Sequence, residues 1–190
     1  MTSRRVSRLL VALVTTAGAM LGATIASAPA SADVSINATV CYNTSQAGSY
    51  AGIANQAATI WNNATVNLTL SAGCGSNLRI YQITGGGSYA VRTSLGNGRV
   101  YIDTQQAAQY SPLRIMTHEI GHILGLPDNY NGNCALLMSG GSAGTSCTNA
   151  YPSTAEANRV SSLFAGTRIG ADVGSQVFQD SWPAAAVKVG

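Results

Sequence analysis

Charged residues are scarce in this sequence: Asp, Glu, Lys and Arg make up 9% of its 190 residues, and aromatic residues make up 6%. An average soluble domain carries about 25% charged residues, so this composition argues against a disordered chain and against a coiled coil. Histidine is rarer still, with two residues in the whole chain. The sequence has no internal repeat, and its glycines form neither a G-x-G-x-x-G motif nor a Gly-Lys-Ser/Thr phosphate loop. The length suits one domain.

The first 32 residues have the layout of a secretory signal peptide. A basic stretch, SRRVSR, precedes an apolar run over residues 9–25, and small residues close the segment at Ala30-Ser31-Ala32. We expect cleavage after Ala32 and a secreted, extracellular protein. The paired arginines are compatible with twin-arginine export as well as with the general secretory route. No later stretch is long enough to span a bilayer.

The formal net charge of +3 is carried by this signal peptide, which holds three of the ten basic residues. From Asp33 onward the chain keeps seven basic and seven acidic residues, so the mature charge is zero. We therefore expect no nucleic-acid partner, no membrane partner after signal cleavage, and a monomer.

Four cysteines, Cys41, Cys74, Cys134 and Cys147, follow the predicted cleavage site. Secreted domains meet an oxidising environment in which disulfides form, and four cysteines allow three pairings. The pairing that joins each cysteine to its neighbour along the chain is Cys41–Cys74 with Cys134–Cys147. The C-x12-C spacing of the last two is not that of a zinc knuckle, so we interpret the cysteines as structural bridges.

The hydrophobic pattern of the first half predicts both helix and sheet. Strands are predicted at residues 36–43, 66–70, 78–83, 88–93 and 99–103, and a helix at 50–61. We expect strand 36–43 to lie at the sheet edge and the Asn97-Gly98 pair to form a hairpin turn. We expect residues 33–165 to form one domain and residues 166–190 to form an extension of unknown role. A loose appendage, a strand packed on the core and a processed segment are all open for this extension.

One motif in the second half carries the chemistry. Ser111-Pro112 predicts the start of a helix and Gly125 its end. Within it, His118 and His122 lie four residues apart, on one helix face, so both imidazoles can bind one metal ion. Glu119 can reach a water on that metal. This is the H-E-x-x-H arrangement of zinc hydrolases.

A catalytic zinc needs a third protein ligand, and no other histidine exists. The ligand must then be a carboxylate, a thiolate or a tyrosine. Asp128 follows a turn at Gly125 that Pro127 stiffens, and is placed to return to the metal. Glu156 competes for this role, although it also fits a capping box that starts at Ser153 and begins a last helix.

The stretch H-E-I-G-H-I-L-G-L-P-D resembles the snapalysins, small secreted neutral zinc endopeptidases of the metzincin group, and the resemblance continues through DNYNGNCALLMSGGSAGTSCTNAYPSTAEANRV. It covers residues 114–164 closely. It implies an α+β metzincin-like fold: a twisted mixed sheet with a backing helix, an active-site helix and a C-terminal helix. By this resemblance His118, His122 and Asp128 are the zinc ligands, and Glu119 is the general base.

The resemblance assigns further residues. Met138, in LLMSGG, matches the Met-turn, an apolar floor beneath the metal. A Cys134–Cys147 bridge is also implied, in agreement with the local pairing. The family's calcium site is not carried over, because residues 110–114 hold no carboxylate. This leaves Asp103 as a candidate calcium ligand elsewhere.

We therefore expect a secreted zinc-dependent endopeptidase that acts on proteins or peptides, with residues 33–165 as its protease domain. Zinc activates a water, and Glu119 takes a proton from that water and passes it to the leaving amine. Tyr130 is a candidate for steadying the tetrahedral intermediate; the alternative is a packing tyrosine. The strand Val100–Asp103 is expected to be the edge that pairs with an extended substrate.

The resemblance also implies a preference for an aromatic residue after the scissile bond. The alternative from another class is a secreted peptide-binding protein with this fold and no catalysis. The intact Glu119 favours the enzyme, because a binding protein needs no general base.

Overall fold

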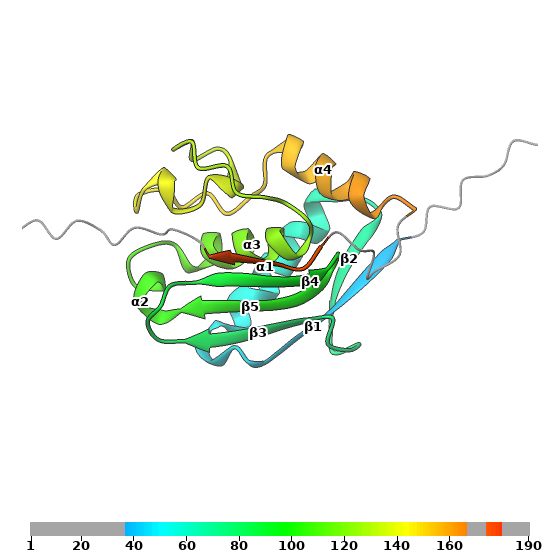
Figure 1. Cartoon of the computed structure of the whole chain (residues 1–190), viewed down its shortest axis with the longest axis horizontal. Coiled ribbons are helices and arrows are strands. Elements are labelled where there is room, and N and C mark those ends of the chain that lie inside the picture. Colours follow the sequence, from blue (N-terminus) through cyan, green and yellow to red (C-terminus); the bar gives the residue numbers. More distant parts are fainter. Residues whose placement is uncertain (1–36, 167–173, 180–190) are drawn as a thin grey trace, which may run out of the picture. The chain divides into compact units, whose positions relative to one another are not determined.

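A six-stranded mixed sheet with helices packed against it forms the described part of the chain (Figure 1). The structure is a computed structural model and describes residues 37–166 and 174–179; the predicted signal peptide lies outside the described residues. The strands are β1 Ala38–Gln46, β2 Leu68–Ala72, β3 Leu78–Ile83, β4 Tyr89–Ser94, β5 Asn97–Asp103 and β6 Gln176–Gln179. The helices are α1 Ala51–Ala64, α2 Thr104–Ala107, α3 Pro112–Ile123 and α4 Thr154–Phe164, with 3-10 helices η1 Gly48–Tyr50 and η2 Leu137–Ala143. The predicted α+β class is confirmed.

The strand order is β2-β1-β3-β5-β4-β6. The pairs β1–β2, β1–β3 and β3–β5 are parallel, whereas β4 runs antiparallel to both β5 and β6. Two edge predictions are therefore wrong. Strand β1 lies between β2 and β3, and β5 lies between β3 and β4. Alternating hydrophobicity shows which face of a strand is buried, but it does not show the position of that strand in the sheet.

The hairpin between β4 and β5 turns two residues earlier than predicted. Ser94 pairs with Asn97, so Leu95 and Gly96 form the turn, and Asn97 already belongs to β5. Gly96 has φ +75°, which glycine adopts without strain. Leu95 is buried in the core, and this burial fixes the turn at Leu95-Gly96 in place of the polar Asn-Gly pair.

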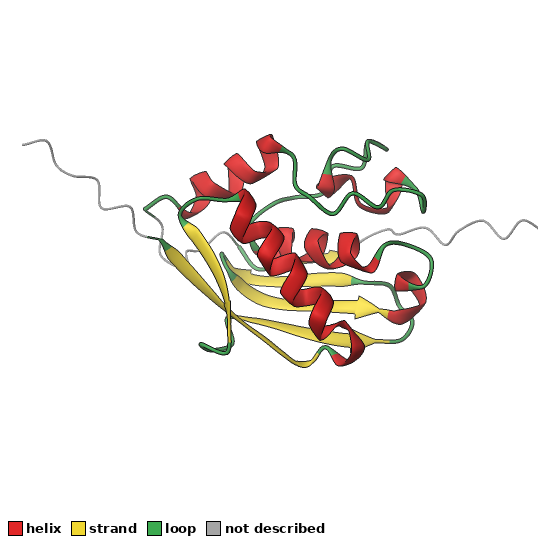
Figure 2. Cartoon of the chain, turned by 180° about the vertical axis from the view of Figure 1, so that it is seen from behind, coloured by secondary structure: helices red, strands yellow, loops and turns green. Residues whose placement is uncertain are grey.

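Helices α1 and α3 pack against each other over the sheet, and α1 crosses in front of the sheet when seen from behind (Figure 2). The strands present alternate residues to these helices; Leu78 and Ile80 of β3 are buried in this way. The indole N–H of Trp61 in α1 donates to the carbonyl of Thr117 in α3 at 3.0 Å. The backing helix is thereby hydrogen-bonded to the helix that carries the H-E-x-x-H motif.

Two disulfides join the cysteines in the pairing that is local in sequence, Cys41–Cys74 and Cys134–Cys147. The first joins β1 to the loop after β2, and the second closes the loop that contains η2. Within residues 37–166 and 174–179, no helix is long and apolar enough to cross a membrane.

Candidate metal centre

Helix α3 is delimited by its own sequence. The hydroxyl of Ser111 accepts the backbone N–H of Arg114, and Pro112 occupies the first turn. At the other end Gly125, with φ +100°, donates to the carbonyl of His122, and Leu126 donates to that of Gly121. This pair of bonds is the Schellman motif, which ends the helix and turns the chain back.

The two histidines lie buried on this helix with their rings directed to one point. Their Nε2 atoms are 3.1 Å apart. Nδ1 of His118 lies 3.0 Å from the carbonyl of Leu137, and Nδ1 of His122 lies 2.9 Å from that of Leu126. Because a carbonyl oxygen can only accept, each Nδ1 carries the hydrogen, and each Nε2 presents a lone pair. Two lone pairs at this distance favour a cation between them.

The turn after Gly125 brings Asp128 to the same point. Its Oδ1 lies 3.3 Å from Nε2 of His118 and 3.3 Å from Nε2 of His122. In the described residues, these three form the one group of His, Cys, Asp and Glu that could hold a metal ion. Tetrahedral zinc with bonds of about 2.0 Å places its ligand atoms about 3.3 Å apart, so the donor set and its spacing fit zinc.

Glu156, the competing candidate for the third ligand, lies elsewhere. It forms the capping box of α4 with Ser153. Its Oε1 accepts the N–H of Met138 at 2.8 Å, and its Oε2 accepts those of Leu137 at 3.1 Å and Ser153 at 2.7 Å. The carboxylate is thus bonded to the backbone of the η2 segment, and through Leu137 it helps to position the carbonyl that orients His118.

Met138 lies beneath the motif helix, as an apolar floor requires. It is buried, and a Cβ on Gly121 would lie 3.0 Å from its Sδ. Glycine between the two histidines therefore permits this close approach. The carbonyl of Met138 accepts the N–H of Asn129 at 2.8 Å, which ties the η2 segment to the residue after Asp128.

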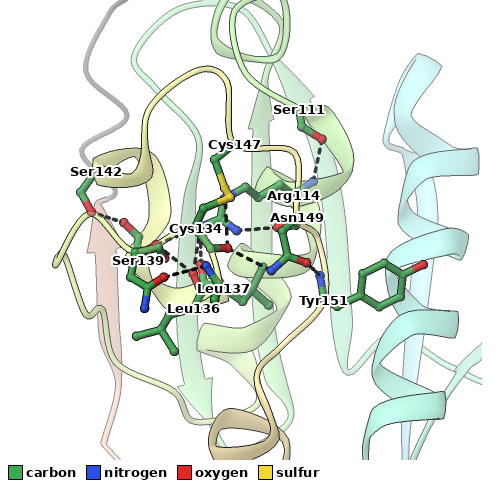
Figure 3. The surroundings of a disulfide bond; sticks show 12 residues. Ser111, Arg114, Cys134, Leu136, Leu137, Ser139, Ser142, Cys147, Asn149 and Tyr151 are labelled. Carbon is green, nitrogen blue, oxygen red and sulfur yellow. Dashed lines mark hydrogen bonds between the residues drawn. A yellow bond between two sulfur atoms is a disulfide. The ribbon is translucent and has the colours of Figure 1, made fainter.

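A buried arginine, which sequence reasoning missed, holds the same segment (Figure 3). Arg114 extends from the first turn of α3, and its guanidinium donates to five acceptors. They are the carbonyls of Leu136, Leu137, Gly140 and Asn149 and the hydroxyl of Ser139. Burial lowers the pKa of Arg114, and the nearby carboxylate of Glu156 acts in the opposite direction. The sequence held one sign of this role: Arg114 is a basic residue within the otherwise apolar pattern of the helix.

The other predicted catalytic residues lie close by. Glu119 is buried directly after His118 on α3. Tyr130 is 44% exposed. A Cβ on Gly140 would lie 3.1 Å from Cε1 of Tyr130 and 3.2 Å from Cε1 of His118, so both rings flank this glycine. Tyr130 thus lies on the same side of the η2 segment as the first histidine.

The carboxylate of Asp103, the candidate calcium ligand, is hydrogen-bonded to backbone N–H groups. Its Oδ1 accepts the N–H groups of Gly85 and Gln105, and its Oδ2 accepts that of Gly87. The carboxylate caps α2 and closes the loop before β4.

Comparison with known proteins places this site in a family. Residues 37–167 match the model of the Streptomyces extracellular neutral proteinase (M7) family. An extracellular small neutral protease of Streptomyces caespitosus is 44% identical over 128 residues, which are 67% of this chain and 97% of the relative. Proteins of the same name from Streptomyces sp. strain C5 and Streptomyces lividans are 44% and 41% identical over 129 residues, 67% of this chain. The match spans 56% and 57% of these two relatives, so the chain covers less than two thirds of their length.

Proposed function

The chain belongs to the Streptomyces extracellular neutral proteinase (M7) family, and from this membership we propose a zinc mechanism for a secreted metalloendopeptidase. In this proposal His118, His122 and Asp128 hold the zinc ion. The observation that carries it is the convergence of two Nε2 atoms and one carboxylate oxygen within 3.1 to 3.3 Å of one another.

The ligand set suits a Lewis acid. Two neutral imidazoles and one carboxylate leave a divalent ion with a net positive charge. The carbonyls of Leu137 and Leu126 keep both histidines in the tautomer that presents Nε2. When bound, zinc would polarise the peptide carbonyl and acidify the attacking water.

Glu119 is the proposed general base. It is buried and follows His118 directly on the motif helix. It accepts a proton from the attacking water and delivers it to the nitrogen of the leaving amine. Tyr130 is proposed to donate its hydroxyl hydrogen to the developing oxyanion.

The substrates in this proposal are proteins and peptides, and the enzyme acts as a monomer. The resemblance of the motif adds a preference for an aromatic residue after the scissile bond. Peptides that differ only in Phe or Ala at that position would test this preference by their kcat/KM.

The sharpest test of the mechanism uses Glu119→Gln, which removes the base and keeps the side-chain volume. We expect casein hydrolysis to fall by about 10²- to 10⁴-fold, the contribution of a positioned general base. Zinc content, measured by elemental analysis, should stay at one ion per chain, and 1,10-phenanthroline should abolish the activity of the parent. Equal hydrolysis by the variant, or an active parent without zinc, would overturn the proposal.

A further inference from the structure

Strand β4 is tied to the candidate metal centre by packing and by a hydrogen bond. Helix α3 packs against it. Arg92 of β4 is buried, and its Nη1 donates to the carbonyl of His122 at 3.1 Å. A segment that pairs with the outer edge of β4 is therefore held beside a residue that we propose as a zinc ligand.

In this chain that edge is occupied by β6, which comes from the C-terminal extension. The pairing is antiparallel, with Tyr89 opposite Gln179 and Arg92 opposite Gln176. Figure 1 shows β6, in red, alongside β4 and next to α3. Backbone pairing of this kind accepts any extended peptide, because the main chain supplies the hydrogen bonds.

One side chain of β6 reaches the metal centre. Phe178 is 4% exposed and stacks on the ring of His122, with centroids 4.2 Å apart and an interplanar angle of 11°. The guanidinium carbon of Arg92 lies 4.9 Å from the centroid of the Phe178 ring. The phenyl ring thus covers one face of the imidazole.

Apart from the Phe178 ring, the described part of β6 is held by its ladder with β4 and by two side-chain hydrogen bonds. Val177 is 60% exposed on the opposite face. Outside the ladder, Gln176 accepts from Arg92 at 3.4 Å and Gln179 donates to the carbonyl of Gly86 at 3.2 Å. The strand also lies beyond residues 37–167, the part that matches the family. The strand is four residues long with one buried side chain, so a competing extended peptide would have to replace only this ladder, the Phe178 ring and the two glutamine contacts.

We propose that β6 takes the place of an extended substrate on the outer edge of β4 and acts as an internal competitor of substrate. This inference rests on the proposed function of the metal centre. It predicts that release of β6 exposes the edge of β4 and the face of His122. Substrate binding then improves, while the chemical step is unchanged.

The test compares Phe178→Lys with Val177→Lys in the otherwise complete mature chain. Both add one positive charge to β6, but only Phe178→Lys forces that charge against Arg92 and His122. Burial of one Phe side chain corresponds to roughly ten- to hundredfold in an equilibrium constant. We expect KM for a quenched fluorescent peptide to fall about tenfold or more in Phe178→Lys, with kcat unchanged and Val177→Lys like the parent. Equal KM values in all three proteins would overturn the inference.

A second measurement does not depend on catalysis or on the folding of Phe178→Lys. A labelled peptide of residues 174–179 is titrated against Glu119→Gln chains with and without Phe178→Ala. We expect tighter binding, by fluorescence anisotropy, when Phe178 is replaced, and no binding of the same peptide with Ala in place of its Phe. Equal binding of both peptides would show that the ring does not anchor the segment. Because this arm needs no hydrolysis, its failure is distinguishable from failure of the zinc mechanism.

Discussion

The two halves of the proposed metal site are held in place by different means. The helix half consists of His118, Glu119 and His122, and a single helix with caps from its own sequence positions all three. The loop half consists of Asp128, Tyr130 and Met138, none of which lies in an α-helix or a strand. Its backbone is bonded to residues distant in sequence, chiefly Arg114 and Glu156.

The position of the helix half is thus determined by residues close in sequence, and that of the loop half by residues distant in sequence. The spacing of the helix half follows from 3.6 residues per turn, and caps at both ends of the helix fix where it lies. The loop half depends on a buried guanidinium, a capping carboxylate and the Cys134–Cys147 bridge. Substitutions at the supports of the loop half should therefore change metal binding without touching a ligand.

The largest expected effect comes from Arg114→Met, which removes the guanidinium that ties the first turn of α3 to the η2 segment. Hydrogen bonds to a charged group contribute about 1.5–3 kcal/mol each, so the loss of several should lower the free energy of unfolding by about 3 kcal/mol or more. The measurement is urea unfolding monitored by circular dichroism. Arg159→Met, at an exposed position of α4, is the matched control and should change stability by less than about 0.5 kcal/mol. Equal midpoints for the two variants would contradict the role given to Arg114.

An intermediate effect is expected from Glu156→Gln, for which the chain offers a close control. In both Glu156 and Asp103 one oxygen accepts two backbone N–H groups and the other accepts one. We expect Glu156→Gln and Asp103→Asn each to destabilise the fold by about 1–3 kcal/mol.

Of these two substitutions, only Glu156→Gln should lower the affinity for zinc. Glu156 positions Leu137, and the carbonyl of Leu137 orients His118. Partners of metal ligands contribute about 10- to 100-fold to metal affinity. We therefore expect a loss of this size in Glu156→Gln, measured by competition with a zinc-binding dye, and none in Asp103→Asn. An equal loss in both variants would mean that general stability, rather than the loop half, sets the affinity.

Most of the fold was predictable because its signals are local. The period of apolar residues located α1 and α3, and alternation located the first five strands. The order of the strands was not predictable in the same way. Burial of one face looks alike in a central strand and in an edge strand. Strand β6 lies in the C-terminal extension, whose sequence left a loose appendage, a strand packed on the core and a processed segment open.

The candidate site divides similarly. The spacing of His118 and His122 was sufficient to place them together. The turn expected at Gly125 and Pro127 favoured Asp128 over Glu156 as the third ligand. The structure places Asp128 beside both histidines and bonds Glu156 to backbone N–H groups. The role of Arg114 was missed because four of its five acceptors are backbone carbonyls, and the sequence does not show which carbonyls lie near a side chain.

The smallest expected effect concerns Tyr130, the most exposed member of the loop half. If its hydroxyl donates to the oxyanion, Tyr130→Phe removes one hydrogen bond that forms only in the transition state, about 0.5–1.5 kcal/mol. We expect kcat for peptide hydrolysis to fall by about two- to tenfold, with KM and zinc affinity unchanged, because the ring still packs beside Gly140. Tyr151→Phe, at a more exposed tyrosine, should leave all three constants as in the parent. An unchanged kcat in Tyr130→Phe would assign this residue to packing, and catalysis would then need only Glu119 from the helix half besides the metal.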